Sequence, residues 1–103
     1  MTYDLVLRNG LVVDGSGLGS FRADVGIVGD RIATIGRIRA RGREEIDADG
    51  LAVTPGFIDG HTHLDAQVFW DPIGANSCWH GVTSVVMGNC GFTLAPSAEE
   101  NAA

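Results

Sequence analysis

The chain has 103 residues, enough for one ordinary domain, and 45% of them are hydrophobic against 19% charged. This composition is globular and excludes an intrinsically disordered chain. The net charge is −6 and there is no lysine, which argues against nucleic acid or an anionic membrane as a partner. No stretch reaches the length of a membrane span, and the N-terminus lacks the features of a signal peptide. We therefore expect a cytoplasmic protein in which Cys78 and Cys90 are free thiols or a ligand and not a disulfide.

The first half of the sequence predicts short strands joined by glycine-containing turns, the pattern of an all-β layer or half of a sandwich. Asn9-Gly10 predicts a two-residue hairpin turn, because a type I′ turn needs positive φ at both central positions. The basic run 36–43 is expected to be solvated. The expected strands are 3–8, 11–14, 21–28, 31–35, 44–48 and 51–54.

The second half changes to the pattern of a parallel α/β unit. Two short apolar strands are expected over 57–63 and 83–88, and the second resembles a parallel strand buried on both faces. Between them, Asp71 as the cap and Pro72 at the first helical position predict a short helix, which completes one βαβ unit. Ser97–Glu100 is a capping box that opens a further helix. Because the sequence stops three residues later, we expect a fragment.

Two histidines stand one residue apart at the end of the first apolar strand. Side chains at i and i+2 leave the same face of a strand, so His61 and His63 are expected to lie side by side. Two neutral imidazoles held this way are half of a metal site. Asp59 has the same parity and either orients an imidazole or is satisfied by backbone amides. Asp65 either reaches the site or, as we prefer, is a solvated loop residue.

Cys90 lies just beyond the second parallel strand. The C-terminal ends of adjacent parallel strands lie at one edge of a sheet, so Cys90 is expected near the histidine pair. A buried structural cysteine is the alternative, but the flanking glycines and Asn89 favour a metal ligand. A thiolate combined with imidazoles suits zinc. Asn89 is itself a candidate for contact with the ligands or the substrate.

These motifs resemble those of the amidohydrolase superfamily and, within it, the N-acyl-D-amino-acid deacylases (D-aminoacylases). The H-x-H pair is shared across the superfamily, whereas the Asn-Cys-Gly element narrows the resemblance to this branch. The resemblance rests on the runs Asp4–Gly10, Val12–Gly15, Pro55–His63, Trp79–Val86 and Gly88–Phe92.

The resemblance implies a truncated two-part fold. Residues 1–54 would form the N-terminal part of a small β-sandwich. Residues 55–103 would begin a metal-dependent (β/α)8 TIM barrel, with strands 1 and 2 and the opening of the next helix. His61, His63 and Cys90 would be zinc ligands in a hydrolase that cleaves N-acyl-D-amino acids with metal-activated water.

The resemblance also implies what this chain lacks. The other metal ligands and the general base would come from beyond residue 103, so no catalytic residue is expected here and the chain alone is predicted to be inactive. One alternative is a hydantoinase or dihydroorotase type of amidohydrolase, which relies on a later carboxylated lysine. Another is a non-catalytic β-rich remnant that forms homo-oligomers through exposed strand edges.

Overall fold

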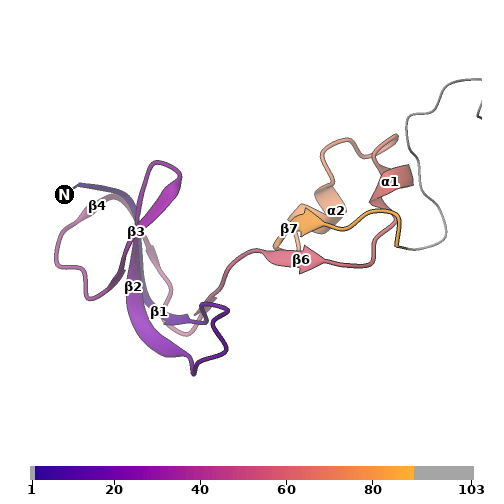
Figure 1. Ribbon diagram of the computed structural model, residues 1–103. Helices are drawn as coiled ribbons and strands as arrows, with labels where there is room; N and C mark the ends of the chain where they lie inside the picture. Colours follow the sequence, from indigo (N-terminus) through magenta and orange to yellow (C-terminus); the bar gives the residue numbers. More distant parts are fainter. Residues whose placement is uncertain (1, 90–103) are drawn as a thin grey trace, which may run out of the picture. The chain divides into compact units, whose positions relative to one another are not determined.

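The computed structural model describes residues 2–89, and the chain divides into two compact units between Pro55 and Gly56 (Figure 1). None of the helices in these residues is long and apolar enough to cross a membrane. The first unit contains β1 (Tyr3–Val12), β2 (Phe21–Val28), β3 (Arg31–Gly36), β4 (Gly42–Asp47) and β5 (Ala52–Val53). The second unit contains β6 (Phe57–Asp59), α1 (Leu64–Gln67), α2 (Ala75–Cys78) and β7 (Val82–Val85).

The first unit is one sheet with the strand order β3-β2-β1-β4, and β5 also pairs with β1. β2 lies antiparallel to both β1 and β3, whereas β4 and β5 run parallel to β1. The predicted all-β character of the first half is confirmed, and β2 has the predicted bounds. The signal for this strand is an alternation of apolar residues between two glycine-containing loops.

The predicted Asn9-Gly10 hairpin turn is wrong, because β1 runs through both residues. Asn9 has a φ of 58° and lies at a register shift between Leu7 and Gly10. The positive φ of Asn9 therefore belongs to a β-bulge within the strand and not to a turn between strands. Both features favour residues that tolerate positive φ, so the dipeptide alone does not distinguish them. Gly10 also allows β5 to approach, since an added Cβ would lie 2.5 Å from Val53 Cγ2.

A small buried core holds the connection between β3 and β4. It consists of Tyr3, Val6 and Ile38, and Val6 is completely buried. The prediction that the run 36–43 is solvated is therefore wrong at Ile38. Arg8 secures this connection, because its Nη1 donates a 2.6 Å hydrogen bond to the Ile38 carbonyl. Sequence analysis misses a single core residue of this kind because most of its neighbours in the sequence are basic or small.

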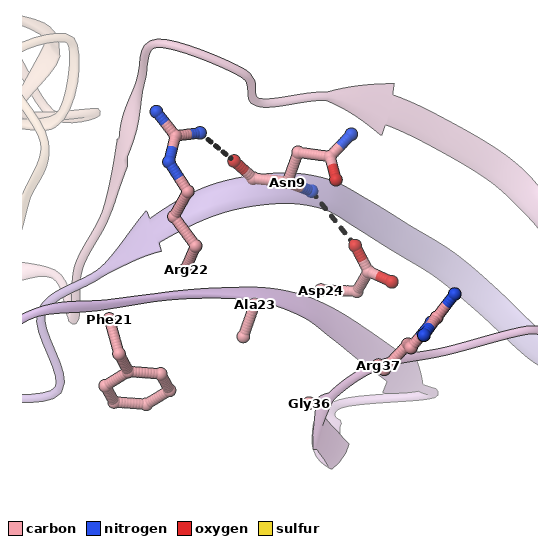
Figure 2. A pocket seen from close by; sticks show the side chains of 7 residues that line it. All are labelled: Asn9, Phe21, Arg22, Ala23, Asp24, Gly36 and Arg37. Atoms are coloured by element: carbon pink, nitrogen blue, oxygen red, sulfur yellow. Dashed lines mark hydrogen bonds between the residues drawn. The ribbon is translucent and has the colours of Figure 1, made fainter.

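Asp24 links the bulge to the same connection. Its Oδ1 accepts the backbone N–H of Asn9 and its Oδ2 accepts that of Ile38, both at 3.0 Å. Figure 2 shows the first of these bonds. Arg8 Nη1 lies 3.4 Å from Asp24 Oδ2. The bond from Asn9, followed by the bond from Ile38 and the charge of Arg8, holds the pKa of Asp24 below its usual value.

Replacing Asp24 by Asn should loosen both segments. The asparagine loses the charge that faces Arg8, and its amide N–H cannot accept from a backbone donor. We expect the free energy of local opening at the amides of Asn9 and Ile38 to fall by about 1–3 kcal/mol at pH 7. Hydrogen exchange measures this protection. D30N is the control, because the Asp30 side chain is 93% exposed. Equal protection in D24N and D30N would contradict the assigned role.

The same variant should change the response to acid. A lowered native pKa means that the stabilisation by Asp24 is present above the unfolded-state pKa of about 3.9. It is then lost as the pH falls through the lower folded-state pKa. Protection of these amides should therefore decline with acid more steeply in the wild type than in D24N.

The second unit is built on β6 and β7, which pair in parallel (Figure 1). This confirms the predicted parallel pairing. The helices between them differ from the prediction, because Pro72 lies in a turn and α2 begins only after Gly74, whose φ is 59°. α1, which begins after His63, is not predicted at all. Four residues are little more than one helical turn and show no apolar periodicity.

The second unit leaves much of its apolar surface uncovered. Within β7, Val82 and Val85 are only half-buried and the two residues between them are exposed, so the prediction of burial on both faces is wrong for this unit. Trp70 and Trp79 are 73% and 81% exposed. These side chains have no packing layer among the described residues. The predicted helix start at Ser97–Glu100 lies outside the described residues.

Candidate metal site

His61 and His63 follow β6 and are not part of it. The strand ends at Asp59, His61 lies in a bend, and His63 is the N-cap residue of α1. The prediction that both lie on a strand is therefore wrong, because the chain turns into α1 first. The rings nevertheless lie near each other, with centroids 6.4 Å apart and planes tilted by 43°. Both residues are exposed, so both imidazoles are open to a ligand.

Asp59 holds the backbone of this turn. Its Oδ1 accepts the backbone N–H of His61 at 3.0 Å. Its own carbonyl accepts the N–H of Val86 at 2.8 Å, which extends the pairing with β7. Within residues 2–89, the carboxylate is bonded to a backbone amide and not to an imidazole. Asp59 therefore fixes where His61 leaves the sheet.

Asn89 connects the loop after β7 to the loop after β6. Its Nδ2 donates a 2.6 Å hydrogen bond to the carbonyl of Gly60, the residue before His61. Because β6 and β7 run in parallel, both loops leave the sheet at the same edge. Cys90 is the next residue in the sequence and lies outside the described residues.

Asp65 is buried, so the preferred interpretation of a solvated loop residue is wrong. It lies in the first turn of α1 and is only 5% exposed. Its Oδ2 has no hydrogen-bond partner among the described residues. The burial depends on α1, and no periodicity in the sequence reveals so short a helix. Asp65 is thus the functional candidate whose environment the sequence misjudges most.

The side chains after β6 carry atoms of the kinds that bind metal ions. His61 and His63 provide two imidazoles, and the buried Asp65 carboxylate lacks a donor. Zinc in proteins usually takes four ligands, commonly imidazole nitrogens and thiolates. No group of three or more potential ligand residues is found in the part of the chain that the structure describes. A complete site therefore needs ligands that residues 2–89 do not supply.

A cavity of about 380 Å³ in the first unit is not part of this candidate site (Figure 2). Two of its three charged groups already have partners: Arg22 donates to Asp49 at 2.7 Å and to the Asn9 carbonyl at 3.2 Å, and Asp24 accepts backbone amides. None of the predicted site residues lines it. Its lining consists of Asn9, Phe21, Arg22, Ala23, Asp24, Gly36 and Arg37.

Removing the Asn89 side chain should loosen the turn that carries the histidines. N89A deletes the bond to the Gly60 carbonyl, which is expected to contribute about 0.5–1.5 kcal/mol. Hydrogen exchange at the amides of Gly60 and His61 should become faster by the corresponding factor. N76A is the matched control, because Asn76 is also exposed. Its backbone carbonyl bonds His80, and this bond is retained in the variant. Unchanged exchange in N89A would show that the bond does not restrain the turn.

Residues 44–102 match the amidohydrolase family, and the chain belongs to this family. It is 46% identical over 100 residues to a D-aminoacylase from Alcaligenes xylosoxydans xylosoxydans. It also resembles the crystal structure of a D-aminoacylase that defines a novel subset of amidohydrolases, with a TM-score of 0.83 and 44% identity. An N-acyl-D-glutamate deacylase from Bordetella bronchiseptica, complexed with zinc and a phosphonate inhibitor, gives a TM-score of 0.84 and 37% identity.

These likenesses cover nearly all of this chain but a small part of each relative. The matches span 96%, 96% and 98% of the chain, and 21%, 21% and 22% of the three relatives in the same order. The chain therefore spans about a fifth of the length of the relatives that it matches.

Proposed function

We propose that the protein is a zinc-dependent hydrolase that cleaves the amide bond of N-acyl-D-amino acids, and that His61 and His63 are two of its metal ligands. The main support is the pair of exposed imidazoles, 6.4 Å apart, directly after a parallel strand. The deacylases that match nearly the whole chain support the substrate class. The zinc and inhibitor bound to one of them support the metal and the hydrolytic reaction.

We further propose that β6 and β7 are the first two strands of a (β/α)8 barrel over residues 55–103, and that residues 1–54 belong to a β-sandwich. A barrel of this kind needs about 250 residues, which agrees with the relatives' greater length. The uncovered apolar side chains of the second unit, such as Trp79 and Ile58, are those that neighbouring barrel elements would cover.

The residues of this chain would bind and orient rather than transfer protons. Zinc, when bound, would lower the pKa of a water molecule to about 7 and polarise the substrate carbonyl. His61 and His63 would hold it as neutral imidazoles, and Cys90 would add a thiolate. Asp59 holds the backbone of His61, and Asn89 holds the loop before it. The general base is expected beyond residue 103, as in the family that the sequence resembles.

The alternatives have less support. Several of the relatives that match nearly the whole chain are deacylases, which favours this branch over a hydantoinase or dihydroorotase type. The Asn89-Cys90-Gly91 element points to the same branch. Membership in an amidohydrolase family favours an enzyme over a non-catalytic remnant.

The protein expressed from its complete reading frame should hydrolyse N-acetyl-D-amino acids and leave their L enantiomers nearly untouched. A panel with apolar and acidic side chains, assayed for the released amine, tests both the reaction and the side-chain preference. H61A and H63A should lose most activity and bound zinc, because each removes one proposed ligand. H80A is the control, since the His80 ring bonds the backbone carbonyl of Asn76 in α2 and is not a proposed ligand. Hydrolysis of hydantoin or dihydroorotate instead would contradict the proposal.

The 103-residue chain on its own should be inactive. Residues 2–89 contain no group of three metal ligands, and the general base is expected outside the chain. Purified chain incubated with zinc and the substrates of the active protein should therefore release no amine above the background. Amine release by the 103-residue chain that persists in its H80A variant but is lost in its H61A variant would contradict this expectation. Such a result would show that a complete site forms within 103 residues.

A further inference from the structure

Asp65 is a buried carboxylate without a donor in the part of the chain that the structure describes. It is 5% exposed, and its Oδ2 has no hydrogen bond. Burial of an unpaired carboxylate is strongly unfavourable, and buried polar atoms in native proteins nearly always have a partner. The Oδ2 atom therefore needs a donor that residues 2–89 do not supply.

The neighbouring carboxylates do not share this property. Asp59 accepts the backbone N–H of His61, and Asp71 Oδ2 accepts Nε2 of Gln67 at 3.3 Å. Among the acidic residues described in the second unit, Asp65 alone combines deep burial with an oxygen that lacks a donor.

Few groups in this half of the chain can serve as that donor. No lysine or arginine follows Arg43 in the 103 residues, so a cationic partner would have to come from elsewhere. The imidazoles of His61 and His63 lie four and two residues from Asp65 in the sequence. An imidazole has two nitrogens, so a ring that binds a metal through one can donate its remaining N–H through the other. Within residues 2–89, neither ring is engaged in a hydrogen bond of its own.

We propose that Asp65 is a positioning residue of the metal site. Its carboxylate accepts the free ring N–H of one of the two histidines when that ring binds the metal. The bond selects the tautomer and fixes the orientation of the ring, as carboxylates do for metal-bound histidines in general. The inference rests on the proposed metal site, because a ring that binds the ion through one nitrogen would keep an N–H on the other that can donate to Asp65.

Zinc affinity and apo stability together test this role. The protein from its complete reading frame is prepared as wild type, D65N and D65A, with D71N as the matched control. We expect competition with a chelator to show a loss of zinc affinity of about 10–100-fold in D65N, a larger loss in D65A, and none in D71N. The thermal midpoint of zinc-free D65N should not fall, since under this proposal the carboxylate gains its partner only when zinc binds.

A second measurement needs no variant. Zinc-loaded wild-type protein should show a downfield, slowly exchanging histidine ring N–H signal by NMR that is missing from the zinc-free protein. Absence of this signal, or wild-type zinc affinity in D65N, would overturn the inference. So would a fall in the zinc-free midpoint of D65N, because this would show that the carboxylate already has a structural donor without the metal.

The two proposals fail in different ways. If H61A and H63A lose zinc while D65N retains it, the metal site stands and the role of Asp65 does not. If H61A and H63A bind zinc like the wild type, the proposed site itself is wrong.

Discussion

The parallel pairing of β6 and β7 is the constraint on which the candidate site depends. Antiparallel strands would place the loop after one strand at the opposite edge from the loop after the other. The parallel pair instead brings both loops to one edge, where Asn89 bonds the carbonyl that precedes His61. Residues almost thirty positions apart thus share one surface. This arrangement explains how short motifs in separate segments can contribute to a single metal site.

Much of this arrangement follows from local features of the sequence. The bounds of β2 and the pairing of the two apolar strands are predicted correctly, because strand-length apolar runs between glycines are strong signals. The H-x-H pair supplies two candidate ligands, and their binding of a metal stays a prediction. These features need no knowledge of distant contacts, since the chemistry or the conformational preference lies in adjacent residues.

The failures have a common physical origin in tertiary context. Asn9 has the same positive φ in a bulge as in a turn, and only the pairing with β2 distinguishes the two. Ile38 is buried by Tyr3 and Val6, which are distant in sequence. Asp65 is buried because a one-turn helix begins where strand alternation was expected to continue. In each case the decisive neighbour lies outside the window that a local pattern describes.

The two units satisfy their polar groups to different degrees, and this difference bears on function. In the first unit, Asp24 accepts two backbone amides and faces Arg8, so its carboxylate is fully used by the fold. In the second unit, Asp65 is buried with an unbonded oxygen beside two exposed imidazoles in the sequence. A fold under selection for stability alone gains nothing from such a carboxylate, because an apolar side chain would avoid its desolvation. We attribute this acceptor, unused among residues 2–89, to a partner that arrives with the proposed metal.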